Sequence, residues 1–223
     1  MHLSWLHSSI GKKMLMALSG LALFGFVLAH LAGNLLIFLG PDALNAYALK
    51  LEHFGAWLWA ARAGLLAALV VHIVTSAQLT IENRRARPQA YAAYRPVETT
   101  LAARTMMATG ILLLAYLVYH LLHFTFRVTN PGISHGVDAL GRRDVYTMVV
   151  HSFQQLPISL AYVLGVGAVC IHLSHGIAST CQTLGLNNER TIAAVSLAGR
   201  MLAAAVFLGY SSIPVAVFAG YIK

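Results

Sequence analysis

The sequence predicts an all-α transmembrane protein in which five helices form a single bundle. Of its 223 residues, 58% are hydrophobic and only 10% are charged, whereas a soluble domain carries about 25% charged residues. Five long stretches contain no Asp, Glu, Lys or Arg, and about 20 apolar residues are enough for a helix to cross the bilayer core. We therefore predict one membrane domain over residues 1–223, with no soluble catalytic domain of its own.

The helices are predicted in order from these uncharged stretches and their flanks, over residues 14–39, 57–81, 101–126, 155–180 and 193–220. Lys12 and Lys13 precede the first helix as in a signal peptide, but its apolar run exceeds a signal core and no cleavage site follows. The fourth stretch is longer than one helix needs. Because Pro157 suits the first turn of a helix, residues 151–156 are expected to approach that helix along the membrane surface.

The placement of positive charge predicts that the N-terminus lies in the cytoplasm and the C-terminus outside. The net charge is +8, and nine of the fifteen Lys and Arg residues fall on the N-terminal side of the membrane. Five of them flank or occupy the connection between the second and third helices: Arg84, Arg85, Arg87, Arg95 and Arg104. A basic loop beside a membrane orients helices or docks a partner protein, so no nucleic acid is expected to bind. We expect a multi-pass protein of a bacterial-type inner (cytoplasmic) membrane.

Four histidines lie inside four different predicted helices, one in each: His30, His72, His120 and His172. A polar ring at this depth in hydrocarbon marks a functional site. At a rise of 1.5 Å per residue, His30 and His120 lie ~6–10 Å to the outer side of their helix centres. His72 and His172 lie ~4–8 Å to the inner side. The four rings therefore form an outer pair and an inner pair.

Two pairs of histidines can supply the axial ligands of two stacked b-type haems enclosed by four helices. There is no Cys-x-x-Cys-His sequence, so the haem would not be covalently attached. A zinc or copper site would need three or four ligands at one depth. Each histidine taken singly is as readily explained as a hydrogen-bonded packing residue. His123 and His175 lie three residues after His120 and His172 on the same helix faces, and are the alternative ligands.

The local sequences around these histidines resemble the di-haem cytochrome b membrane anchor of succinate dehydrogenase and fumarate reductase. The matching strings are HSSIGKKMLMALSGLALFGFVLAHLAGNLLIF, LVVHI, RTMMATGILLLAYLVYHLLHF and CIHLSHG. Their order and spacing cover nearly the whole chain. The resemblance implies that His30 and His120 bind the outer haem, and that His72 and His172 bind the inner one. It also implies a flavoprotein and an iron–sulfur subunit on the cytoplasmic face.

The resemblance also points to a site for quinone. Glu52 follows His30 by 22 residues in the outer connection, where related di-haem anchors carry a carboxylate that handles quinol protons, and His53 stands beside it. The alternative is an ordinary loop carboxylate paired with Lys50. Arg104 opens the third helix and is a candidate partner for a haem propionate. Cys170 stands where some relatives carry a glutamate for a transmembrane proton path, which argues against such a path here.

We therefore expect a membrane anchor and electron-transfer subunit of a succinate:quinone oxidoreductase, in the respiratory chain and tricarboxylic acid cycle. It would pass electrons between the iron–sulfur subunit and a membrane quinone, with menaquinone favoured, through two haem b groups. Two alternatives remain at this point. One is the cytochrome b anchor of a hydrogenase or formate dehydrogenase, and the other is a haem-free anchor or small transporter.

Overall fold

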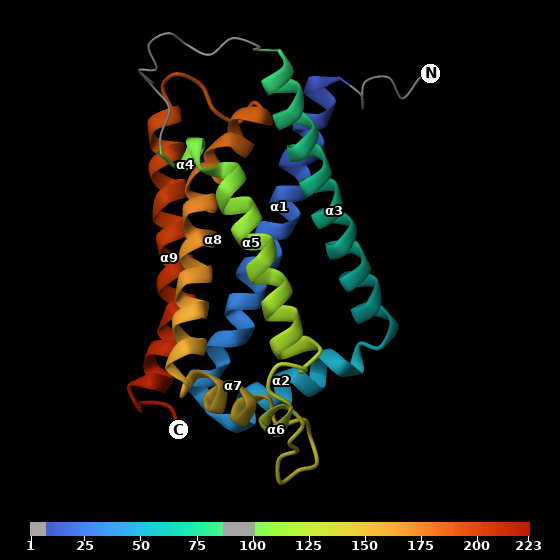
Figure 1. Ribbon diagram of the computed structural model, residues 1–223, viewed down its shortest axis with the longest axis vertical. Coiled ribbons are helices and arrows are strands. Elements are labelled where there is room, and N and C mark those ends of the chain that lie inside the picture. The colour runs from blue at the N-terminus through green and yellow to red at the C-terminus, as the bar shows by residue number, and fades with distance from the viewer. Residues whose placement is uncertain (1–7, 87–100) are drawn as a thin grey trace.

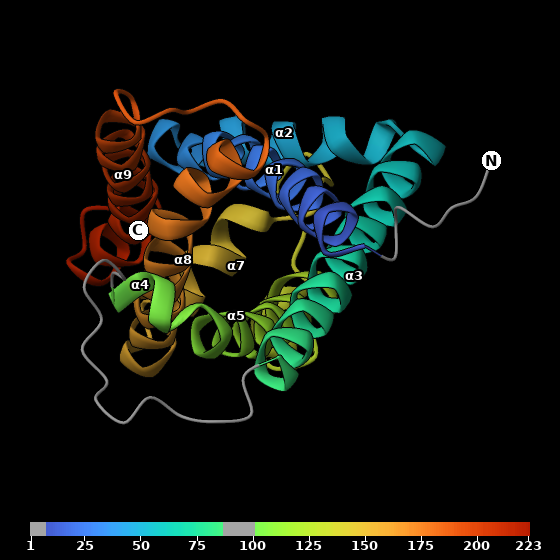
Figure 2. The same ribbon diagram turned by 90° about the horizontal axis from the view of Figure 1, so that it is seen from above.

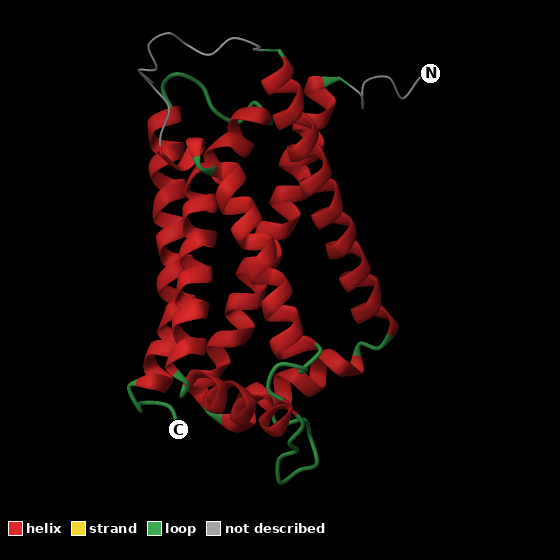
Figure 3. Ribbon diagram, in the orientation of Figure 1, coloured by secondary structure: helices red, strands yellow, loops and turns green. Residues whose placement is uncertain are grey.

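A computed structural model describes residues 8–86 and 101–223, and five of its helices are long and apolar enough to span a membrane (Figure 1). The prediction of an all-α five-helix membrane protein is confirmed, and Figure 3 shows that helices dominate the described residues. The spanning segments are α1 (Ser9–Asn34, extended by a 3-10 turn over Leu35–Leu39), α3 (Ala56–Arg85), α5 (Met106–His120, extended by a π turn over Leu121–Thr125), α8 (Leu156–Thr183) and α9 (Ile192–Phe218).

The bundle has an end that holds the start of α1 and the end of α3, and an opposite end that holds the C-terminus (Figure 1). We call the first the inner end and the second the outer end, after the predicted topology. α1 packs against α3 and α8, and α8 also packs against α5 and α9. Viewed along the bundle, α1, α3, α5 and α8 stand around a common axis, whereas α9 lies outside them (Figure 2).

The outer end carries helices that the sequence did not predict. The expected connection after the first span forms α2 (Pro41–His53), which begins after Gly40 at φ 98° and is separated from α3 by Gly55 at φ 50°. Residues expected only to approach the fourth span form part of α7 (Val145–Phe153), whose start is capped by Asp144. A short helix, α6 (Pro131–Ser134), precedes it.

Burial differs between the cap and the spanning part of the bundle. A cluster of buried side chains joins α2, α7, α8 and α9 at the outer end, and comprises Ile37, Leu44, Val150, Phe153, Tyr162, Ile213, Val217 and Ile222. In the most apolar stretches of α1, α3 and α5, only 11% of residues are buried, against 33% in α9. These three helices therefore leave most of their surface to lipid, to partner subunits or to a bound group.

Candidate functional site

The inner pair of histidines joins α3 to α8. The rings of His72 and His172 have centroids 6.3 Å apart. Nδ1 of His72 lies 3.1 Å from the carbonyl oxygen of Met16 on α1. Since a carbonyl can only accept, Nδ1 carries the hydrogen and donates it, which leaves Nε2 with an unshared electron pair.

His172 is fixed in the same tautomer by α5. Its Nδ1 lies 3.2 Å from the hydroxyl oxygen of Thr109. That hydroxyl in turn lies 3.0 Å from the carbonyl oxygen of Thr105, to which it can only donate. Thr109 therefore accepts from Nδ1–H of His172, and Nε2 again keeps its electron pair. Histidines that bind metals usually have their second nitrogen bonded in this way.

The outer pair joins α1 to α5. The rings of His30 and His120 have centroids 5.8 Å apart and lie nearly perpendicular, at 83°. Nδ1 of His120 is buried with no hydrogen-bond partner among the described residues. Aromatic rings surround the pair instead, with centroids 5.3–6.3 Å from one histidine or the other: Phe26, Tyr116, Phe124, Tyr162 and Tyr210.

A π turn separates His123 from the ligand face of α5. The extra residue in the turn over Leu121–Thr125 rotates the positions that follow His120. His123 is fully buried, with Nδ1 3.0 Å from the Tyr162 hydroxyl and Nε2 3.2 Å from the Ser152 hydroxyl. Because the Ser152 hydroxyl donates to the carbonyl of Met148 at 2.7 Å, it accepts from Nε2–H, and Tyr162 donates to Nδ1. Both nitrogens of His123 are therefore engaged within the protein.

The two pairs fit bis-histidine ligation of haem. A metal–imidazole bond of about 2.0–2.1 Å on each side of one ion places the two ring centroids about 6 Å apart, as both pairs are. Glycine faces each inner ring: a Cβ on Gly20 would lie 3.1 Å from Cε1 of His72, and one on Gly110 would lie 3.7 Å from Cε1 of His172.

Within residues 8–86 and 101–223, no three His, Cys, Asp or Glu residues lie close enough together to form a metal cluster. His175 lies half-buried on α8.

Glu52 lies in the last turn of α2 rather than in a loop. Its Oε1 lies 3.1 Å from a guanidinium nitrogen of Arg143, so its ion pair is not the one with Lys50 that the sequence offered. His53 follows it and is exposed. Glu52 and Arg143 border a hollow of about 280 Å³ between α2, the first turns of α3 and the end of α5. We call this the outer hollow; its lining residues are Glu52, Gly55, Leu58, Trp59, Arg62, Thr125, Arg127 and Arg143.

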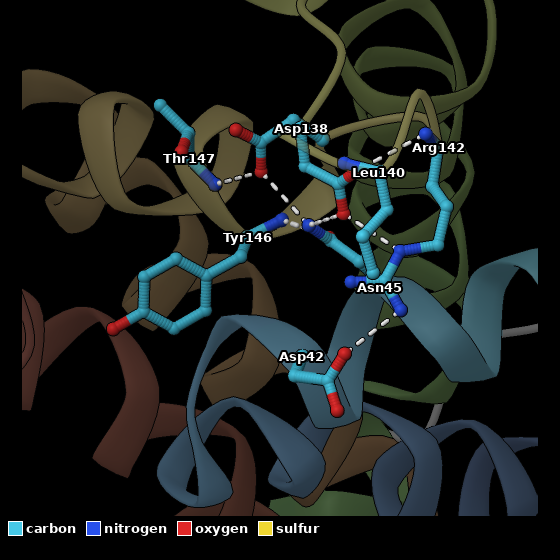
Figure 4. Close-up of polar contacts among 8 residues, drawn as sticks. Asp42, Asn45, Asp138, Leu140, Arg142, Tyr146 and Thr147 are labelled. Atoms are coloured by element: carbon cyan, nitrogen blue, oxygen red, sulfur yellow. Dashed lines mark hydrogen bonds and ion pairs between the residues drawn. The ribbon is translucent and has the colours of Figure 1, made fainter.

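A polar clamp holds the segment that carries Arg143 against α2 (Figure 4). Asn45 is 1% exposed; its amide donates to Asp138 at 3.2 Å and to Asp144 at 3.1 Å, and its carbonyl accepts from the backbone N–H of Tyr146 at 3.0 Å. Arg142 bridges Asp138 at 2.7 Å and Asp42 at 2.9 Å. Since Arg143 follows Arg142, the clamp also sets where Arg143 lies.

The clamp carboxylates are held in their charged form. Desolvation raises the pKa of Asp138, but hydrogen bonds from Arg142, Leu140 and Asn45 outweigh it and leave that pKa below its ordinary value. Desolvation likewise raises the pKa of Asp144, and hydrogen bonds from Thr147 and Asn45 bring it below the ordinary value. Both carboxylates are therefore charged at neutral pH, where they accept the hydrogen bonds of the clamp.

The inner end carries the predicted basic residues. Arg84 and Arg85 end α3, while Arg104 is exposed at the end of the short helix α4 (Leu101–Arg104), which packs beside α8. Arg87 and Arg95 lie outside the described residues. An ion pair between Lys12 and Glu82 joins α1 to α3 at this end.

A family model described as the succinate dehydrogenase/fumarate reductase transmembrane subunit matches residues 82–207, more than half of the chain. The chain belongs to this family. It is therefore the multi-pass membrane anchor of such a complex, as the resemblance predicted, and family membership implies association with the other subunits. The match includes His120 and His172 and begins after His30, Glu52 and His72. No curated protein and no solved structure matches the chain.

Proposed function

We propose that this anchor carries electrons between an iron–sulfur subunit at its inner end and a membrane quinone at its outer end, through two b-type haems. His72 and His172 would hold the inner haem, and His30 and His120 the outer one. The observation that supports the proposal is the pair of facing histidines at each of two levels, 6.3 Å and 5.8 Å apart. The flavoprotein and iron–sulfur subunits would dock on the cytoplasmic side, where the N-terminus is predicted to lie.

The chain's own residues would hold each ligand in the required form. Bound haem supplies a one-electron carrier. Met16 and Thr109 keep hydrogen on Nδ1 of the two inner histidines, so that Nε2 of each would be free to bind iron. In the outer pair, the surrounding rings hold His30 and His120 by packing. Since both His123 nitrogens are engaged, His120 is the proposed ligand on α5.

Glu52 is the proposed proton carrier for the quinone, with His53 beside it. Quinone reduction takes two electrons and two protons, and quinol oxidation returns them. The Glu52 side chain is 40% exposed and borders the outer hollow, so that it can reach both a quinone and the water outside. We favour menaquinone as the quinone.

The haem content of the purified complex tests the electron-transfer part of this proposal. We expect a pyridine haemochrome assay to give two b-type haems for each copy of this chain, both low-spin in the oxidised state. One haem would contradict one of the two pairs. None would identify the chain as a haem-free anchor.

Glu52→Gln tests the quinone part separately. The substitution keeps size and hydrogen bonding but removes the exchangeable proton, so quinone-coupled turnover should be lost. Both haem spectra and the dye-linked activity of the soluble subunits should be unchanged. Lys50→Gln is the matched control, because Lys50 lies on the same helix but does not line the outer hollow. Normal quinone turnover in Glu52→Gln would place the quinone elsewhere.

A further inference from the structure

Arg127 has an unusual backbone conformation at the border of the outer hollow. At φ 58° it is the only non-glycine residue with positive φ among residues 8–86 and 101–223. It follows the π turn of α5, where the N–H of Val128 bonds to the carbonyl of Leu122 at 3.0 Å. Helix ends of this kind favour glycine, because a Cβ is strained there. Strain retained at a bulky charged residue indicates that the side chain is needed at this position.

The Nε of the Arg127 guanidinium lacks an acceptor among the described residues. A terminal nitrogen donates to the carbonyl of Ser134 at 3.1 Å, which fixes the side chain against α6. Its Nε is buried and has no hydrogen-bond partner in the described part of the chain. An unsatisfied buried donor on a charged group is unfavourable, and a bound water, ion or ligand is one of the explanations for it.

The charges around the outer hollow show what kind of partner would fit. Three guanidinium groups and one carboxylate line it, which leaves two positive charges in excess. Arg143 is paired with Glu52, and Arg62 lies over the ring of Trp59 at 4.9 Å. Trp57 and Trp59 at this end are 79% and 68% exposed, as expected of aromatic residues at a membrane–water boundary. A ligand that presents acceptor oxygens and comes from the membrane therefore fits the hollow.

We infer that Arg127 binds the quinone oxygen that Glu52 does not serve, and stabilises the negative charge that gathers on the ring as electrons arrive. The inference rests on the proposed quinone reaction in the outer hollow. When a quinone is reduced there, two electrons enter the ring and both carbonyl oxygens become hydroxyls. Glu52 delivers one proton to the oxygen that it faces and is reprotonated from water, and the oxygen bound by Arg127 takes the second proton from water that enters the hollow. Arginine stays protonated, so Arg127 contributes hydrogen bonds and charge but no proton.

The test uses the intact complex and two substitutions of Arg127. Arg127→Gln removes the charge and the fork of donors, whereas Arg127→Lys keeps the charge alone. The binding probe is menadione, a tail-less naphthoquinone, followed by quenching of Trp59 fluorescence, with Trp59→Phe defining the signal. Arg127→Gln should weaken menadione binding by about tenfold or more and lower kcat with quinone by about 100-fold. Arg127→Lys should recover part of kcat, and Lys50→Gln should behave as the unaltered complex.

The outcomes distinguish failure of this inference from failure of the proposed quinone site on which it rests. Loss of turnover in Glu52→Gln with normal binding and turnover in Arg127→Gln would overturn the role of Arg127 alone. Normal turnover in both variants would overturn the quinone site itself and this inference with it. Both Arg127 variants could instead lose the outer haem, or shift its redox midpoint, while menadione binding stays unchanged. That result would make Arg127 a propionate partner and overturn the inference. Unchanged haem spectra and thermal midpoint in Arg127→Lys would show that the complex remains assembled.

Discussion

The inner and outer histidine pairs are oriented by different forces, although their rings are similarly spaced. Each inner histidine has Nδ1 bonded, to Met16 on α1 or to Thr109 on α5. The outer pair is surrounded by aromatic rings, and Nδ1 of His120 has no partner among the described residues. A hydrogen bond fixes the tautomer and raises the basicity of a ligand, whereas ring packing fixes only its position. Hydrogen bonds therefore set the tautomer of the inner histidines, whereas packing against aromatic rings sets the position of the outer ones.

The two ends of the bundle differ in the same way that their proposed tasks differ. The outer end has the clamp, the outer hollow and Glu52, which is open to water. The inner end presents Arg84, Arg85 and Arg104. Proton exchange needs a titratable group that water can reach, whereas docking of a partner subunit needs charge on a surface.

The largest expected effect is the loss of one haem from one level. His172→Ala should remove the inner haem and His120→Ala the outer one, since iron that loses an axial ligand becomes high-spin or leaves the pocket. Optical spectra and haemochrome quantitation should show one low-spin haem in each variant. His175→Ala is the control and should keep both. If His120→Ala keeps both haems while His123→Ala loses one, the ligand on α5 is His123.

His123→Ala should destabilise the complex without removing a haem. The substitution leaves a void in a fully buried site, where the Tyr162 hydroxyl loses its partner and the Ser152 hydroxyl keeps only its bond to the Met148 carbonyl. The cost should be about 3 kcal/mol. The thermal midpoint should fall clearly while both low-spin spectra persist. An unchanged midpoint would show that the π turn repacks around the smaller side chain.

The clamp should make the outer end sensitive to acid. Because the pKa values of Asp138 and Asp144 are lowered by folding, their stabilisation is fully present above the unfolded pKa of about 3.9. It is lost as pH falls through the lower folded values. Asn45→Ala should remove three hydrogen bonds and cost about 2 kcal/mol at neutral pH. Limited proteolysis near Leu140 should increase in that variant at pH 7, and in the unaltered protein only below about pH 4. Equal cleavage in both at pH 7 would show that the clamp does not hold this segment.

Thr109→Val should give the smallest effect, a shift in the potential of the inner haem alone. Losing a hydrogen bond worth about 1 kcal/mol makes His172 a weaker electron donor and should raise the midpoint by about 40 mV. Ser19→Ala is a matched control, since Ser19 lies 3.4 Å from Nδ1 of His72 but that nitrogen is already served by Met16. A redox titration that moves the outer haem instead would reverse the assignment of the two levels.

The sequence alone determined the five spans and the two levels of histidine. Absence of charge over about 20 residues is a local property, and the depth of a residue in a helix follows from a fixed rise of 1.5 Å. Neither needs knowledge of how the helices pack. The bounds of α2 escaped this reasoning, because α2 carries charged residues and no long uncharged run. The bounds of α7 escaped it because α7 and α8 share one uncharged run, so that absence of charge does not separate them.

Only the tertiary structure decided which groups surround each histidine and what Glu52 pairs with. One added residue in the π turn separates His123 from the face of His120, and no periodicity in the sequence marks that residue. Arg143 lies far along the chain from Glu52, and Asn45 bonds to residues 93 and 99 positions away. Such contacts form when separate helices are brought together by packing, so a sequence read as a series of local patterns does not contain them.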